Sequence, residues 1–379
     1  MHQFLKKVIS ILSCYLFLFL PIFLNADTPP TVLIVGYGFM GSNHVKNLEA
    51  LQKNQLVTIA GIVDTDAKRL EGLSYPCFLD FFEAYEAVSP DIVAITANTQ
   101  AHYAIIQNIL AASEGKKAPA LFIEKPLVET SAQAEQCLEQ LQNYPAPLTC
   151  GYQFRNSPTV KSAIKFINEN NLKIENIRAV WQKKRLPTRP SAGVHLDEAT
   201  HPIDLILNHL LPAVGMVNEP VSLVCHSRKY DDTMIDKQQQ AMLYPYQPEQ
   251  LLPLAEVAFE IQTPDTDISV FSSFIRAPQV RELTLHCSSD IIMKLNFDMN
   301  QTDQISISRP PHTSFRTLSI ESHQQPNKLL YEWHDFLQYY KTAAPSSTIP
   351  TLQDMVSAVQ ITEMLSEMPL HQPMQVLRK

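Results

Sequence analysis

Residues 31–41, TVLIVGYGFMG, constrain the fold more than any other part of this chain. Residues 31–35 are β-prone and mostly apolar, which predicts a short, buried parallel strand. A Gly-x-Gly-x-x-Gly turn follows, and residues 42–51 have the apolar period of a helix. Three of the chain's 9 glycines fall in this turn. Such a turn binds a pyrophosphate through free N–H groups and the positive end of the helix dipole. We therefore expect a dinucleotide site; the alternative is a glycine turn without a ligand. The candidate contacts are Gly36, Tyr37, Gly38, Phe39, Met40 and Gly41.

Chain length, net charge and cysteine spacing limit the classes of protein to which this chain can belong. A chain of 379 residues is long enough for two domains. The net charge of −8 argues against a nucleic-acid surface, and no basic patch interleaved with aromatic residues appears. The 6 cysteines are scattered, without the close pairs of a zinc or redox site. We therefore expect neither a metal site nor a nucleic-acid partner.

The first 28 residues have the order of a targeting segment. Lys6 and Lys7 precede the uncharged stretch 8–24, and small and polar residues follow at 25–27. This order predicts a signal peptide or a membrane anchor over residues 1–28. The protein would then be exported or attached to a membrane by its N-terminus. A mis-assigned start codon is the third alternative and would leave the protein in the cytoplasm.

An acidic residue follows the second predicted strand. Residues 56–63 predict that strand, and Asp64 comes about 20 residues after the last glycine of the turn. A carboxylate at this place accepts hydrogen bonds from the adenosine ribose and repels a 2′-phosphate. We therefore expect NAD(H) to be preferred, with NADP(H) as the alternative. Arg69 is either a ligand for that 2′-phosphate or a solvated helix charge.

Strands and helices continue to alternate after Asp64. Residues 91–95 and 120–123 predict strands, and residues 102–112 predict a helix between them. This alternation predicts an α/β fold, with a parallel Rossmann dinucleotide-binding domain over residues 29–150. Ligands bind at the carboxyl ends of such strands. Further candidates for cofactor binding therefore stand at these ends: Asn98, Thr99, His102, Glu124 and Lys125.

The pattern changes after residue 150. Residues 174–182 predict a strand, and the β-rich stretch 221–308 has successive strands without helices between them. We expect an α+β domain over residues 151–379, with a mostly antiparallel open sheet. Residues 329–341 and 352–368 predict helices, and the last helix is expected to pack back on the Rossmann domain. Three arginines are candidates for gripping a phosphate or carboxylate of a substrate: Arg155, Arg185 and Arg189.

Five motifs in sequence order resemble the glucose–fructose oxidoreductase, inositol dehydrogenase and MocA (Gfo/Idh/MocA) superfamily. They are VGYGFMG at 35–41, ITANTQAH at 95–102, FIEKPL at 122–127, GYQFRNSP at 151–158 and GVHLDEATHPIDL at 193–205. The resemblance implies a site built from Lys125, Asp197 and His201 beside the nicotinamide. It also implies a sugar, cyclitol or sugar derivative as substrate. The open face of the sheet would form the subunit interface of a homodimer or homotetramer.

Residue chemistry agrees with these roles. Oxidation of a carbinol requires removal of the hydroxyl proton, and an imidazole is a natural base for it. A spacing of four places Asp197 and His201 on one side of a helical turn. Because proline suits only the first turn of a helix, Pro202 predicts a helix start near Glu198 or Thr200, with Asp197 just ahead of it. The structural alternatives are a surface lysine at 125, a helix cap at 197 and a packed histidine at 201. Four neighbours are expected to be structural: His195, Glu198, Asp204 and His209.

The sequence therefore predicts an NAD(H)-dependent oxidoreductase that acts on a secondary hydroxyl or carbonyl of a carbohydrate-like molecule. His201 would take the proton and Lys125 would polarise the oxygen. Two alternatives stay open. One is an NAD-using glycosidase of the same superfamily, and the other is an inactive dinucleotide-binding sensor or scaffold.

Overall fold

The computed structural model describes residues 28–184, 193–229, 254–297, 303–309, 316–318 and 327–367. The predicted N-terminal targeting segment lies outside these residues up to position 27. Within the described ranges, none of the helices combines the length and the apolar character needed to span a bilayer.

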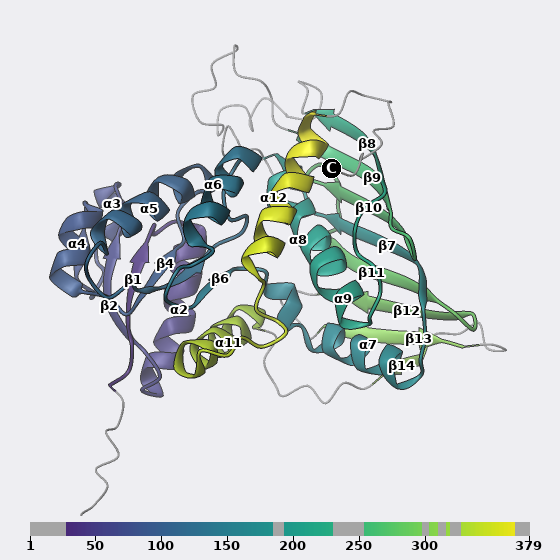
Figure 1. The fold of residues 1–379 in the computed structure, drawn as a ribbon, viewed down its shortest axis with the longest axis horizontal. Coiled ribbons are helices and arrows are strands. Elements are labelled where there is room, and N and C mark those ends of the chain that lie inside the picture. The colour runs from purple at the N-terminus through teal and green to yellow at the C-terminus, as the bar shows by residue number, and fades with distance from the viewer. Residues whose placement is uncertain are drawn as a thin grey trace, which may run out of the picture.

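The N-terminal part contains a parallel sheet of six strands with helices on both faces (Figure 1). Its strand order is β3-β2-β1-β4-β5-β6, the order of a Rossmann dinucleotide-binding fold. The strands are β1 Thr31–Val35, β2 Thr58–Val63, β3 Cys77–Phe78, β4 Ile92–Ile95, β5 Ala120–Ile123 and β6 Leu148–Cys150. The helices are α2 Phe39–Lys53, α3 Ala67–Leu70, α4 Phe81–Val88, α5 Thr99–Ala112 and α6 Ser131–Leu141. The predicted Rossmann domain is confirmed.

Alternate side chains of the central strands pack into two separate hydrophobic cores, one on each face of the sheet. Leu33 and Val35 of β1 belong to the core that contains α4, α5 and α6. Val32 and Ile34 face the other side, where they belong to the core of α2. Both faces of the sheet are therefore dry, which explains why strands such as β4 and β5 are uninterrupted apolar runs.

The C-terminal part contains an eight-stranded sheet in the order β14-β13-β12-β11-β7-β10-β9-β8. Among the described strand pairs of this sheet only β7–β10 is parallel, so the predicted mostly antiparallel sheet is confirmed. The strands are β7 Ile174–Gln182, β8 Ser222–Lys229, β9 Leu254–Gln262, β10 Asp267–Ser273, β11 Val280–Cys287, β12 Ile291–Asn296, β13 Gln304–Ser308 and β14 Arg316–Leu318. Helices lie on one face of this sheet (Figure 1). They include α7 Pro158–Glu169 and the helical run from η2 His195–Ala199 to α9 Leu211–Ala213.

Two C-terminal helices connect the parts. Trp333 and Phe336 of α11, Lys328–Thr342, pack into the α2 core of the Rossmann sheet. Helix α12, Leu352–Glu367, lies between the Rossmann domain and the large sheet (Figure 1) and contacts α6 and η2. The site residues of both parts are thereby held in one frame.

The helix that carries Asp197 and His201 differs from our expectation. Helical backbone already begins at Val194, and it continues through η2 His195–Ala199, α8 Thr200–Ile203, η3 Asp204–Leu210 and α9 Leu211–Ala213. Both η2 and η3 are π-helical. The predicted start near Glu198 or Thr200 is wrong, because the helix continues through the π-helical turn η2 before it reaches α8, whose first turn contains Pro202. Asp197 is therefore an interior residue of the helix and not its cap.

Candidate functional site

The glycine turn has the backbone geometry of a phosphate cradle. Gly36 has a φ of +99°, and a Cβ there would lie 2.4 Å from the Cα of Ala97. A Cβ on Gly41 would lie 2.1 Å from the carbonyl oxygen of Gly36. Gly38 is open, since the nearest atom to a Cβ there is a guanidinium nitrogen of Arg69 at 3.8 Å. Within the described ranges no side chain caps α2, so the N–H groups of its first turn remain available to a ligand. These features fit a dinucleotide pyrophosphate.

Asp64 ties the glycine turn to the end of β2. Its carboxylate accepts a hydrogen bond from the backbone N–H of Tyr37 at 2.7 Å and from that of Asp66 at 2.9 Å. Arg69 Nη1 lies 3.4 Å from the same carboxylate, and its side chain is about half exposed. A carboxylate and a half-exposed guanidinium thus stand side by side where a ribose 2′ position would lie. The first favours a hydroxyl and the second a phosphate.

A cleft of about 850 Å³ opens at this edge of the Rossmann sheet. That volume is within the range of ligand pockets. Seven of the predicted cofactor residues line it: Gly36, Tyr37, Gly38, Phe39, Met40, Asp64 and Asn98. Asn98 also caps α5 by accepting the N–H of Ala101 at 3.1 Å.

Other predicted cofactor residues support the cleft from behind. His102 is 1% exposed, and its two nitrogens lie at 3.0 Å from the carbonyl oxygen of Pro126 and at 3.1 Å from that of Ala97. Its imidazole therefore fastens the Lys125–Pro126 loop to the end of β4 and does not line the cleft. Thr99 begins α5 directly after Asn98, and Gly41 lies within α2 under the glycine turn.

A buried chain of hydrogen bonds leads from α11 to Lys125. Trp333 Nε1–H donates to Nδ1 of His44 at 2.9 Å. Because Nδ1 accepts, the ring proton is on Nε2, which donates to Glu124 Oε1 at 2.7 Å. The other oxygen of Glu124 accepts the backbone N–H of Lys125 at 3.2 Å. His44 and Trp333 are both fully buried, so the sequence of donors is fixed by its surroundings.

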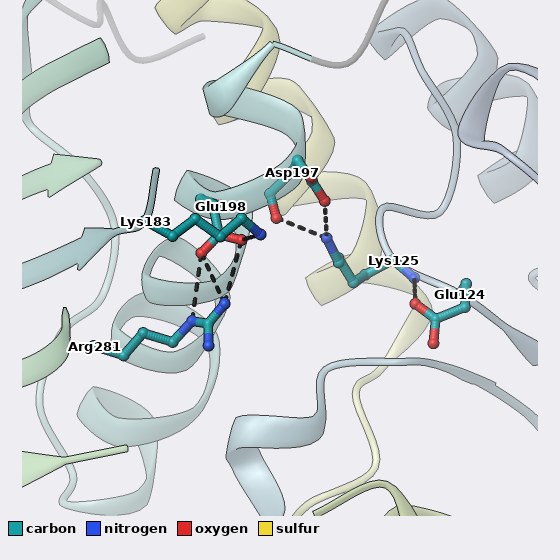
Figure 2. Close-up of polar contacts among 6 residues, drawn as sticks. All are labelled: Glu124, Lys125, Lys183, Asp197, Glu198 and Arg281. Atoms are coloured by element: carbon teal, nitrogen blue, oxygen red, sulfur yellow. Dashed lines mark hydrogen bonds and ion pairs between the residues drawn. The ribbon is translucent and has the colours of Figure 1, made fainter. Parts of the chain in front are cut away.

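Lys125 and Asp197 meet although they come from different domains. The Lys125 ammonium donates to the backbone carbonyl of Asp197 at 2.7 Å and to its carboxylate at 3.0 Å (Figure 2). Both side chains keep some exposure, 12% for Lys125 and 23% for Asp197. The pair therefore forms a contact that a ligand can reach.

His201 lies close to this pair on the same helix. It is 6% exposed, and its ring stands edge-on to Phe154 at 4.9 Å. Burial lowers the pKa of His201 well below its usual value, the charges of Lys125 and Arg281 lower it further, and Asp197 opposes them. Its Nδ1 has no hydrogen-bond partner within the described part of the chain. The imidazole is therefore neutral near pH 7.

Glu198 anchors a second charged cluster that sequence reasoning did not identify. Its carboxylate is 2% exposed and contacts Lys183 at the end of β7 and Arg281 of β11 (Figure 2). Lys183 and Arg281 are far apart in sequence and meet because β7 pairs with β11. No local pattern in the sequence signals that pairing.

The predicted substrate arginines have different outcomes. Arg155 is 1% exposed and forms a two-pronged ion pair with Asp204, at 2.8 Å from Nε and 2.5 Å from Nη2. It also contacts Asp354 of α12 at 3.3 Å. Arg155 is thus a buried structural residue, and its predicted contact with substrate is corrected accordingly. Arg185 and Arg189 lie outside the described residues.

The similarity to known protein sequences is strongest in the Rossmann domain. Residues 31–152 match the family model GFO_IDH_MocA, described as an oxidoreductase family with an NAD-binding Rossmann fold. The chain is 26% identical over 180 residues to inositol 2-dehydrogenase of Rhizobium meliloti (strain 1021), covering 45% of this chain and 52% of that protein. It is 33% identical over 110 residues to inositol 2-dehydrogenase/D-chiro-inositol 3-dehydrogenase of Lactiplantibacillus plantarum, covering 28% and 29%. The match thus spans about half of the first relative and less than a third of the second.

Solved structures extend the likeness in fold to both domains. A levoglucosan dehydrogenase in complex with NADH and levoglucosan superposes with a TM-score of 0.70 at 18% identity, covering 89% of this chain and 96% of that one. UDP-N-acetylglucosamine 3-dehydrogenase from Acidithiobacillus ferrooxidans gives a TM-score of 0.67 at 15% identity, with the same coverage. At these identities the similarity concerns the fold.

Proposed function

We propose that the protein is an NAD(H)-dependent dehydrogenase or reductase. Its residues 31–152 match the Gfo/Idh/MocA oxidoreductases. It would transfer hydride between the nicotinamide and a secondary hydroxyl or carbonyl of a sugar, cyclitol or sugar derivative. One observation carries the proposal. Lys125 of the Rossmann domain touches Asp197 of the second domain, beside the neutral imidazole of His201.

Lys125 is suited to binding the reacting oxygen. A lysine ammonium carries three donors. In the described part of the chain two of them reach Asp197, which leaves the third for a substrate hydroxyl or carbonyl. Asp197 fixes the direction of that third donor and balances the charge of the ammonium. The bound nicotinamide supplies the hydride acceptor or donor.

His201 is suited to taking the hydroxyl proton. A neutral imidazole accepts a proton, and burial keeps His201 in that state. Asp197 is the neighbour that stabilises the protonated ring, because it is the charge that raises the pKa of His201. The proton can therefore be held briefly and then released.

The preference for NAD(H) over NADP(H) rests on Asp64. Its carboxylate is 6% exposed and fixed by two backbone N–H groups, so it cannot swing away from a 2′-phosphate. Of the solved structures with this fold, a levoglucosan dehydrogenase contains NADH and a 3-ketoreductase contains NADP. The fold thus accepts either cofactor, and we assign the preference in this chain to the fixed carboxylate.

The test is a search for NADH formation with a panel of sugars and cyclitols. Lys125→Met is expected to lower kcat by about 10²- to 10⁴-fold, because it removes the donor to the reacting oxygen. Its affinity for NAD should stay unchanged. Lys116→Met is the matched control, since Lys116 is an exposed lysine of the same domain that pairs with Glu86. Equal activities of the two variants would refute the role of Lys125.

The alternatives give different results in the same assay. An NAD-using glycosidase would release an aglycone without net NADH. A sensor or scaffold would bind NAD and turn over none of the panel.

The remaining expectations also stay proposals. We propose a homodimer or homotetramer that uses the face of the large sheet opposite its helices, to be tested by light scattering. Mass spectrometry of the mature N-terminus would distinguish a cleaved signal peptide from an anchor or a mis-assigned start, and hence an exported, membrane-attached or cytoplasmic protein.

A further inference from the structure

The Glu198 cluster holds more positive than negative charge. Arg281 lies 3.3 Å from Glu198 Oε2 through Nη2 and 3.4 Å through Nε. Lys183 donates to the other oxygen, Oε1. Two cations thus share one carboxylate, and the cluster carries one positive charge in excess. An excess charge in a largely buried place is costly unless a partner arrives.

This cluster adjoins the proposed reacting centre. Asp197 and Glu198 are consecutive in η2; the first side chain reaches Lys125 and the second reaches Lys183 and Arg281 (Figure 2). The fields of both Lys183 and Arg281 extend to His201, whose pKa they lower. A substrate held by Lys125 and His201 therefore lies within reach of the excess charge.

Exposure distinguishes the two cations. The Lys183 side chain is 20% exposed, whereas those of Arg281 and Glu198 are 8% and 2% exposed. Arg281 therefore closes the cluster from the sheet side, and Lys183 is the cation that a ligand can reach. One nitrogen of Arg281, Nη1, has no hydrogen-bond partner within the described residues. The Nη1 group of Arg281 can thus still donate a hydrogen bond to a ligand that binds Lys183.

We infer that Lys183, backed by Arg281, forms a subsite for an anionic group on the substrate. The substrate class is then a carbohydrate that carries an oxyanion in addition to its reacting hydroxyl. A carboxylate, as in a uronic acid, and a phosphate, as in a sugar phosphate, share the chemistry that Lys183 recognises. When this group binds Lys183, Arg281 still neutralises Glu198. The inference rests on the proposed function.

The test compares substrates that differ in one group only. Glucose, glucuronate and glucose 6-phosphate form one set, and galactose, galacturonate and galactose 6-phosphate form a second set with the same design. The wild-type protein is expected to favour one charged member over its neutral partner by about 10- to 100-fold in kcat/KM. The member that gains identifies the source of the oxyanion. Because this comparison needs no variant, it does not depend on the folding of a mutant.

Variants then assign the preference to a residue. Lys183→Met is expected to reduce the charged-to-neutral ratio to about one, with NAD affinity unchanged, and Lys183→Arg should restore most of it. Lys184→Met is the matched control, because it removes the same charge from the neighbouring exposed residue. If Lys184→Met lowers the charged-to-neutral ratio as much as Lys183→Met, the preference comes from the overall positive charge of this region, and the subsite is refuted.

The outcomes separate this inference from the proposed function. Equal turnover of neutral and charged members, with NADH formed, overturns the subsite and leaves the oxidoreductase standing. NAD binding without NADH from any member overturns the proposed function, and the inference falls with it.

Discussion

Replacing Trp333 by phenylalanine tests whether α11 positions the Lys125 loop or only packs beneath it. The variant keeps an aromatic ring against Phe122, which stacks on Trp333 at 4.3 Å and 14°. It removes the one N–H that donates to His44 Nδ1. His44 would lose the partner that fixes its proton on Nε2, and Glu124 would lose an ordered donor.

The expected loss of stability follows from burial. An unsatisfied acceptor in a fully buried place costs about 1–3 kcal/mol, and the smaller ring adds a cavity cost on the order of 1 kcal/mol. Activity should fall as well, since displacement of a positioned group costs up to about 10²-fold. We therefore expect kcat/KM to drop by about 10- to 100-fold, with NAD affinity little changed.

The assay pairs urea unfolding with steady-state kinetics, and nitrogen NMR of His44 reports its tautomer directly. Phe336→Leu is the control, because Phe336 is fully buried in the same core, contacts Phe122 edge-on and donates no hydrogen bond. It should cost on the order of 1–3 kcal/mol of stability and leave the His44 resonances unchanged. If Trp333→Phe keeps kcat/KM within about twofold of wild type and leaves the tautomer unchanged, the reasoning is refuted.

Three further predictions concern cofactor, core and pH. Asp64→Ser should shift the ratio of NADP to NAD affinity by at least about tenfold towards NADP, because it removes the charge that repels a 2′-phosphate; fluorescence titration with both cofactors measures it, and an unchanged ratio would contradict the assignment. Arg155→Met should cost about 3–5 kcal/mol in urea unfolding, because it leaves the buried carboxylate of Asp204 without its cation; a loss below about 1 kcal/mol would show that the pair is unimportant. Burial lowers the pKa of His209 to about 3 and that of His201 well below 6.5. The unfolded chain therefore binds more protons below about pH 6.5, so stability should fall as pH decreases from there towards about 3, by up to about 1.4 kcal/mol per pH unit for each histidine. The urea midpoint at several pH values checks this, and His209→Gln should reduce the slope.

The Rossmann domain could be predicted because its signals are local. The strand at residues 31–35, the glycine turn and the acid after the next strand follow one another within one βαβ unit. Asp64 illustrates the limit of that prediction. Its place at the end of β2 was expected, but its bond to the N–H of Tyr37 depends on the closed turn.

Residues joined over long distances in sequence could not be predicted. Trp333 and His44 are 289 residues apart, and neither belongs to a motif that names the other. Arg155 was predicted to grip an anionic group of the substrate, yet its guanidinium pairs with Asp204, 49 residues away. The same holds for Lys183 and Arg281, which only the pairing of β7 with β11 brings together.

The start of the helix around Asp197 was predicted wrongly for a different reason. Pro202 was expected to mark the start of the whole helix, but it stands in the first turn of α8, and the π-helical turn η2 precedes α8 without a break. A widened turn changes which side chains share a face. In this case it still brings Asp197 to Lys125, the contact that the resemblance implied.

The place of α11 has a consequence for synthesis on the ribosome. One side of the Rossmann sheet, including Val32, Ile34 and Phe122, is covered by Trp333 and Phe336. Trp333 is translated 183 residues after Cys150, which ends the last strand of that sheet (333 − 150 = 183). A nascent chain that has emerged only as far as the Rossmann strands exposes this apolar face of the sheet to the cytosol or to a translocon. Chaperone capture at this stage, and aggregation of fragments cut before residue 328, are the expected costs of closing an early domain with a late helix.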